Sequence, residues 1–151
     1  MIYQLGESSV DMIRPLIDEF IEKANTRYTT DMLVAEYKAR LKNDPLFCVI
    51  VDSPFIDAGE LIAKGFAAYS LSQDGARMVF IGQFYSKCRE TAEALADVIY
   101  NDAIKNECSL VEWISYLPDD VVAKAFVNGK FKYPIKKIGS VLGVEVIHGK
   151  E

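Results

Sequence analysis

The sequence predicts one α/β domain in which a mixed β-sheet carries helices on its faces. Its 151 residues are 50% hydrophobic and 26% charged, a balance typical of a globular chain with a single core. Segments with apolar residues at helical spacing and segments with apolar residues at strand-like spacing follow one another along the chain, in the element order β-α-α-β-β-β-α-β-α-β-β. Turn-forming residues separate these elements without a linker or repeat, so residues 1–151 are expected to form one domain.

The chain opens with a short apolar run, residues 2–5, that we expect to be an edge strand ended by Gly6. A helix follows, because apolar residues recur at helical spacing: Val10, Ile13, Ile17, Phe20, Ile21 and Ala24. Pro15 lies inside this stretch, and proline removes a helical hydrogen-bond donor. Either the helix is kinked there, or a short first turn gives way to a new helix that has proline at its first position.

A second helix is expected to start at Thr30 or Asp31, residue types that accept hydrogen bonds from the free N–H groups of a helix start. Its apolar face repeats every four residues, at Leu33, Tyr37 and Leu41. The Asn-Asp-Pro run at 43–45 ends the pattern, so this helix is expected to stop there.

Three β-like runs come next, at residues 47–51, 61–71 and 78–85. The pair Asp74-Gly75 between the last two runs is typical of a tight hairpin turn. We therefore predict an antiparallel meander of three strands.

The second half of the chain predicts a strand-helix-strand unit and a closing hairpin. A helical stripe begins at Ala92, and a strand follows at residues 110–116. Asp119 or Asp120 is expected to start a last helix, which Asn-Gly at 128–129 ends. Two further strands are expected at 135–138 and 141–147.

Charge and cysteine content exclude several classes of protein. The net charge of −5 and the pI near 5.0 argue against a nucleic-acid binder, which presents a basic face. Cys48, Cys88 and Cys108 have no spacing that predicts a disulfide frame or a metal site. No apolar run reaches the roughly twenty residues of a membrane span, and no signal-peptide pattern is present. We expect a cytoplasmic protein with no metal and no nucleic-acid or membrane partner.

The segment FYSKCRETAEAL, residues 84–95, passes directly from the meander into the next helix. A helix start after a strand is a common phosphate site, because its N–H groups are unpaired and the helix dipole is positive there. With the element order, this junction resembles the GNAT superfamily of acetyl-CoA-dependent acyltransferases over nearly the whole chain. The resemblance implies a GNAT-like α/β fold that binds acetyl-CoA or CoA.

Members of that family hold the CoA pyrophosphate with a loop of the form Gln/Arg-x-x-Gly-x-Gly/Ala. The matching segment here runs from Lys87 to Ala92, which take the first and last positions. The resemblance therefore implies a cofactor site made of Phe84, Tyr85, Lys87, Cys88, Arg89, Glu90, Thr91 and Ala92. Glu90 stands where the family has glycine, so its carboxylate either opposes the phosphates or caps the helix in their place.

The catalytic positions depart further from the family pattern. Phe126 stands where the resemblance implies a tyrosine that protonates the departing thiolate. Gln83 and Tyr85 at the strand end, and Tyr116 on the next strand, are the candidate catalytic residues, each with a structural role as the alternative. Gly82 predicts either a β-bulge that opens the strand for cofactor contacts or a close packing point.

Two functions follow from these observations. The first is transfer of an acyl group from CoA to an amine of unknown identity. The second is a non-catalytic binding or structural module with the same architecture, which can form a homodimer. The retained Lys87 favours the first function, and the missing tyrosine at Phe126 favours the second.

Overall fold

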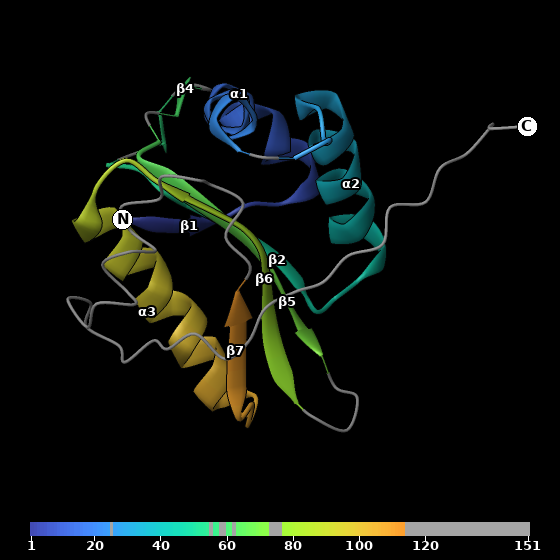
Figure 1. Cartoon of the computed structure of the whole chain (residues 1–151), viewed down its shortest axis with the longest axis vertical. Coiled ribbons are helices and arrows are strands. Elements are labelled where there is room, and N and C mark those ends of the chain that lie inside the picture. Colours follow the sequence, from blue (N-terminus) through green and yellow to red (C-terminus); the bar gives the residue numbers. More distant parts are fainter. Residues whose placement is uncertain (25, 55, 58–59, 62, 73–76, 114–151) are drawn as a thin grey trace, which may run out of the picture.

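The computed structural model describes residues 1–24, 26–54, 56–57, 60–61, 63–72 and 77–113. Its centre is a five-stranded mixed sheet with the strand order β1-β2-β5-β6-β7 (Figure 1). All neighbours in this sheet are antiparallel except β6 and β7, which are parallel. The strands are β1 (Ile2–Gln4), β2 (Phe47–Asp52), β5 (Gly65–Ser72), β6 (Met78–Ser86) and β7 (Leu110–Trp113). This architecture confirms the predicted α/β fold class and the edge position of the first strand.

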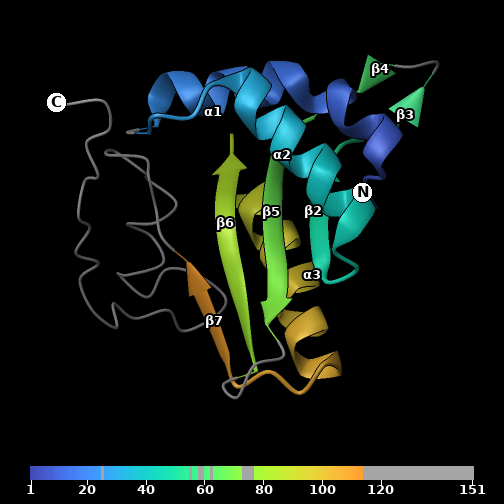
Figure 2. The same cartoon turned by 90° about the vertical axis from the view of Figure 1, so that its right-hand side faces the viewer.

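Helices cover both faces of the sheet. The 3-10 helix η1 (Glu7–Ile13), α1 (Arg14–Lys23) and α2 (Thr30–Asn43) lie on one face, and α3 (Arg89–Lys105) lies on the other (Figure 2). Each face has its own apolar core, one centred on Phe66 and the other on Leu95, both of which are fully buried. The sheet is therefore the middle of three layers.

A new helix begins beside Pro15, nearly as the second predicted alternative has it, with the proline at the second position of the helix and not the first. The 3-10 helix η1 ends at Ile13, and α1 begins at Arg14 with the proline in its first turn. Proline is tolerated there because the first N–H groups of a helix have no acceptor within it. The kinked-helix alternative is wrong.

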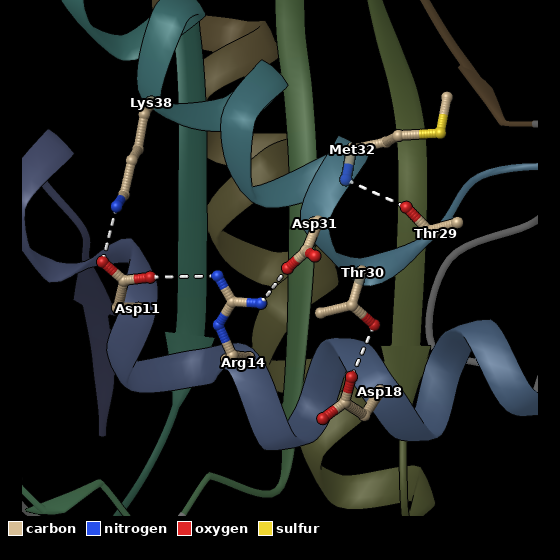
Figure 3. Close-up of polar contacts among 8 residues, drawn as sticks. All are labelled: Asp11, Arg14, Asp18, Thr29, Thr30, Asp31, Met32 and Lys38. Atoms are coloured by element: carbon tan, nitrogen blue, oxygen red, sulfur yellow. Dashed lines mark hydrogen bonds and ion pairs between the residues drawn. The ribbon is translucent and has the colours of Figure 1, made fainter.

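α2 begins at Thr30, as predicted, but its cap is the residue before. Thr29, and not Thr30 or Asp31, is the N-cap, and its Oγ1 accepts a hydrogen bond from the Met32 N–H at 3.2 Å (Figure 3). The Thr30 hydroxyl instead donates to Asp18 on α1 at 2.5 Å. Two threonines in sequence thus serve different purposes, one at the helix start and one between helices.

Replacing Thr29 by alanine removes this cap. We expect Thr29→Ala to lower the free energy of unfolding by about 1 kcal/mol, because the Met32 N–H loses its acceptor. Urea denaturation measures the change. Thr26→Ala is the matched control, because it also removes a hydroxyl that accepts a main-chain hydrogen bond, from Tyr28 N–H at 3.2 Å, but in the loop before α2 and not at a helix start. A loss with Thr29→Ala no larger than the control's would contradict the assignment of the cap.

Ion pairs on the outer surface tie α1 and η1 to α2. Arg14 contacts Asp31 at 2.5 Å and Asp11 at 3.4 Å, and Lys38 contacts Asp11 at 2.5 Å (Figure 3). These groups are exposed, so each pair contributes little to stability in water. Their effect is geometric, since they link α2 to the helices beside it.

The meander is confirmed, with a correction to its middle strand. β2, β5 and β6 are antiparallel neighbours, but β5 begins at Gly65 and not at residue 61. Residues 60–61 instead form β4 (Glu60–Leu61), which pairs with β3 (Ile56–Asp57) in a separate two-stranded sheet. The reason is that the β2–β5 ladder ends where Asp52 meets Gly65, so earlier residues have no partner in the main sheet. The predicted Asp74-Gly75 turn lies outside the described residues.

Both ends of α3 are fixed to the sheet by hydrogen bonds. Near its end, the carboxylate of Asp102 accepts from the hydroxyl of Tyr69 on β5. At its start, Thr91 donates to Asp52 on β2 at 2.7 Å. Buried Leu95 and Ile99 pack between these two anchors. The position of the α3 amino terminus is therefore determined by the sheet.

Several predicted features lie outside the described residues, among them Tyr116, Phe126, the last helix and the closing hairpin. Within the described part of the chain, no helix is both long and apolar enough to cross a membrane.

Candidate functional site

A β-bulge interrupts the pairing of β5 and β6 at Gly82. Ala68 lies opposite Gln83 and Tyr69 lies opposite Ile81, which leaves Gly82 without an opposite residue. The bulge predicted at this glycine is confirmed, and no close packing is found there among the described residues, since the nearest atom to an added Cβ lies 3.7 Å away. The cofactor contacts predicted for the bulge stay a prediction. An extra residue in one strand takes main-chain groups out of the ladder and makes them available to other partners.

The described pairing of β6 with β7 reaches Ile81, the residue before Gly82. Within the described residues, the parallel register runs from Met78 opposite Leu110 to Ile81 opposite Trp113. β6 continues for five more residues, to Ser86. The bulge thus marks the start of a strand segment that extends past the last described residue of its neighbour.

A cavity of about 140 Å³ lies at the bulge, on the face of the sheet that α2 covers. Gly82 and Gln83 line it from β6, and Glu36 and Arg40 line it from α2. The rest of its wall is mostly aromatic and is formed by Tyr28, Phe47, Ala68, Tyr69, Ser70 and Phe80. The cavity therefore combines apolar walls with two opposite charges and exposed main chain, which is the usual composition of a small-molecule site.

Gln83 is oriented by a buried tyrosine on α2. The Tyr37 hydroxyl donates to the Gln83 Oε1 at 2.7 Å. Burial raises the pKa of Tyr37 well above its usual value, so the hydroxyl stays protonated and remains a donor. Since the oxygen of the Gln83 amide is taken, its NH2 group is left to donate to other partners.

Tyr85 is a core residue and does not line the cavity within the described residues. Its ring packs edge-on against Phe20 at 6.3 Å, and its hydroxyl accepts from the Lys23 Nζ at 3.1 Å. That hydrogen bond, with help from nearby Glu19, raises the pKa of Lys23. Of the two strand-end candidates, only Gln83 faces the cavity.

Phe84 points to the opposite face of the sheet. It is buried in the α3-side core, and its ring lies 5.3 Å from that of Trp113. The bulge explains this, because Ile81 and Phe84 fall on the same side of β6 when Gly82 adds one residue between them. Phe84 therefore presents main chain, and not its ring, along the cavity side of the strand.

The strand leads directly into α3, whose start has no side-chain cap. Cys88 is the N-cap residue in extended conformation, and its side chain makes no capping hydrogen bond. Its thiol donates to Thr91 at 3.4 Å instead. Among the described residues, the N–H groups of Glu90 and Thr91 have no acceptor. Such a start favours an anion through free N–H groups and the positive end of the helix dipole.

Charged side chains surround this helix start. Lys87 pairs with Glu19 of α1 at 3.2 Å, and Arg89 pairs with Glu93 at 3.0 Å. Glu90 is exposed and makes no hydrogen bond or ion pair within the described residues, so it does not cap the helix by a side-chain contact. The two cations favour an anion at this point, and Glu90 opposes it.

Gly65 allows the α3 start to lie directly against the sheet. A Cβ atom there would lie 2.7 Å from the Tyr85 carbonyl oxygen and 2.7 Å from Thr91 Cγ2. Thr91 and Ala92 are buried beneath the first turn and pack it onto the sheet. Within the predicted phosphate segment, these two side chains therefore hold the helix start in place.

No pattern in the sequence assigns a function to Glu36, Tyr37 or Arg40. Tyr37 was predicted only as part of the apolar face of α2, which is where it lies. Glu36 and Arg40 are ordinary helix-surface residues until the bulge is placed opposite them. A charged pair one helical turn apart beside a buried tyrosine is the signal that would have pointed to them.

The sequence matches no protein-family model and no curated protein. Solved structures match it over nearly its full length. The chain is similar to a probable acetyltransferase, with a TM-score of 0.72, 14% identity, and 97% of this chain and 99% of that chain covered. It is also similar to the ribosomal-protein-alanine N-acetyltransferase of Brucella melitensis biovar Abortus 2308, with a TM-score of 0.67, 16% identity and coverage of 97% and 99%.

A third similar structure is AAC(6')-Iy in complex with the bisubstrate analogue CoA-S-monomethyl-acetylneamine. The TM-score is 0.64 at 15% identity, with 95% of this chain and 98% of that chain covered. The chain therefore has the fold of these solved structures, which is the GNAT-like fold that the sequence resemblance predicted.

Proposed function

We propose that this protein is an N-acyltransferase that takes its acyl group from acyl-CoA and transfers it to an amine held in the cavity at Gly82. One observation carries the proposal: a single strand, β6, has a bulge at its middle and leads at its end into a helix start that has no side-chain cap. The bulge can offer main-chain N–H groups to the carbonyl oxygen of a thioester, and the helix start can offer them to a pyrophosphate.

The spacing of these two features suits CoA. The run from Gly82 to Cys88 spans about 20 Å if extended at ~3.3 Å per residue. The arm of CoA has about thirteen bonds between its sulfur and its first phosphorus, a reach of roughly 15 Å at about 3.5 Å per three bonds. That length of about 20 Å is an upper limit, because the bulge shortens the path and β6 ends at Ser86, and the pyrophosphate adds to the reach of the arm. One molecule of CoA can therefore reach both features along β6.

The helix start suits a pyrophosphate, although it lacks the glycines of the family loop. The N–H groups of Glu90 and Thr91 supply donors, and Lys87 and Arg89 supply positive charge. Both cations are paired with carboxylates at the surface, where such pairs contribute only about 0–1 kcal/mol each. A phosphate can therefore displace Glu19 and Glu93 at small cost.

The cavity residues suit the transfer step. Bound acyl-CoA supplies an activated carbonyl: the amine nitrogen forms a bond to that carbon, the C–S bond breaks, and the sulfur leaves as a thiolate. The Gln83 NH2 and the Gly82 main chain are donors for the developing oxyanion. The Glu36 carboxylate takes the proton that the amine loses.

Phe126 favours the second candidate, a non-catalytic module of the same fold, because phenylalanine has no proton to give to the thiolate. Such a module would bind an amine or CoA without turnover. Release of free thiol from acetyl-CoA in the presence of a mixture of amines separates the two candidates.

Calorimetric titration with acetyl-CoA tests the proposal. We expect a dissociation constant in the micromolar range. At a free ligand concentration of about a hundred times that constant, binding adds about 2.7 kcal/mol to the stability of the fold. No heat, together with no change in melting temperature at millimolar acetyl-CoA, would remove the proposal.

Removing the charge of Glu90 is expected to tighten the binding of CoA. Glu90→Gln keeps the shape of the side chain but takes away an exposed negative charge beside the free N–H groups of α3. We expect the affinity to rise about threefold or more at low salt, which corresponds to ~0.7 kcal/mol. The measurement is the same titration at two salt concentrations.

Glu7→Gln is the matched control, because Glu7 is an exposed carboxylate in the first turn of η1. It is expected to leave the affinity unchanged. If both variants shift the affinity equally, the effect comes from net charge, and the phosphate site does not lie at α3.

A further inference from the structure

The charged residues of the cavity indicate which kind of amine the cavity accepts. Glu36 and Arg40 lie one turn apart on α2, and both line the cavity. They carry opposite charges but form no ion pair with each other in the described structure. The cavity therefore presents a separate negative group and a separate positive group to whatever fills it.

Arg40 is held away from Glu36 by other contacts. Its guanidinium lies 4.1 Å from the centre of the Phe47 ring, and it reaches Asp44 at 3.5 Å. Stacking on an aromatic face fixes the plane of a guanidinium, so its edge is oriented for planar anions. One nitrogen of that edge contacts Asp44 in a long, solvent-accessible pair that a ligand carboxylate can displace at small cost. Arg40 is thus prepared for a carboxylate.

Glu36 has no cationic partner among the described residues. It is partly buried and stands beside Tyr37, whose protonated hydroxyl is already engaged with Gln83. A carboxylate that is partly removed from water gains from a cation placed next to it. An ammonium group is the cation that an amine acceptor brings.

The size of the cavity limits the ligand. At about 140 Å³ it is close to the 150 Å³ cavity that takes up one benzene molecule, so it has room for about six non-hydrogen atoms. We propose that the acceptor is a small amphoteric molecule, with an ammonium group beside Glu36 and a carboxylate beside Arg40. That this molecule is the acyl acceptor rests on the proposed function.

Four small probes test this inference: β-alanine, its methyl ester, propylamine and propionate. Binding is measured by NMR titration of the protein without CoA, so the result does not depend on acyl-CoA binding. We expect β-alanine to bind at least about tenfold more tightly than each of the other three. Equal affinities for β-alanine and propylamine would overturn the inference.

Two variants assign the charges. Arg40→Gln is expected to remove the tenfold preference for β-alanine over its methyl ester. Glu36→Gln is expected to remove the tenfold preference for β-alanine over propionate. Lys42→Gln and Glu7→Gln, which change exposed charges outside the cavity, are expected to keep both preferences. Unchanged preferences in the Arg40 and Glu36 variants would overturn the inference.

The outcomes separate this inference from the proposed function. Preference for β-alanine without any binding of acetyl-CoA would remove the acyltransferase and keep the amphoteric site. Acetyl transfer to propylamine as fast as to β-alanine would keep the acyltransferase and remove the amphoteric site.

Discussion

Gly82→Leu is expected to reduce acyl transfer by at least about a hundredfold while the protein stays folded. Gly82 lines the cavity at the bulge, where proposed contacts to the thioester come from main chain. A leucine side chain there would occupy the space of the reacting groups, and displacement of a reacting group by ~1 Å can cost about a hundredfold in rate. Thiol release from acetyl-CoA measures the loss.

The structure leaves room for a Cβ atom at position 82. The nearest atom to a Cβ at position 82 is the Ala68 carbonyl oxygen at 3.7 Å, an ordinary contact. We expect the free energy of unfolding to change by about 1 kcal/mol or less. Gly82→Ala, with one carbon, is the graded control and should lose less activity. Full activity in Gly82→Leu would show that the bulge is not the reaction site.

Gly65→Ala is expected to have the opposite profile and to lower stability by about 1–3 kcal/mol. The added carbon would lie 2.7 Å from the Tyr85 carbonyl oxygen, which belongs to the strand backbone and cannot turn away. The melting temperature should fall by about 5 °C, at roughly 2–4 °C per kcal/mol for a chain of this size. Binding of CoA should weaken as well, because Thr91 in the first turn of α3 must move.

Gly6→Ala is the matched control for Gly65→Ala. A Cβ at Gly6 meets nothing within 4 Å, and its φ of −93° is open to alanine. This variant should be as stable as the original or slightly more so, since alanine restricts the unfolded chain. Equal stability of the two variants would contradict the close packing of α3 against β5.

Periodicity in the sequence predicts most of the described fold, because burial on one face leaves a regular apolar pattern. α2 and β2 lie within one or two residues of their predicted bounds. β5 shows the limit of this reasoning. The apolar run from residue 61 contains no break that marks where its partner strand ends, and only the meeting of Asp52 with Gly65 fixes the true start.

The candidate site is less accessible to sequence reasoning, because it depends on contacts between distant elements. The helix start and the bulge at Gly82 leave local signals, a strand that runs into a helix and a glycine within a strand. The orientation of Gln83 leaves none, since its partner Tyr37 is 46 residues away. The pairing of Lys87 with Glu19 is equally invisible, yet it decides how much of the lysine charge is available to a phosphate.

An NMR titration with CoA tests the central claim most directly, because a 16.9 kDa chain gives resolved amide signals. The amide resonances of Glu90 and Thr91 at the helix start and of Gly82 at the bulge are predicted to shift together and to saturate at one CoA per chain. An absence of shifts at millimolar CoA, or shifts confined to residues away from β6 and the start of α3, would contradict the account.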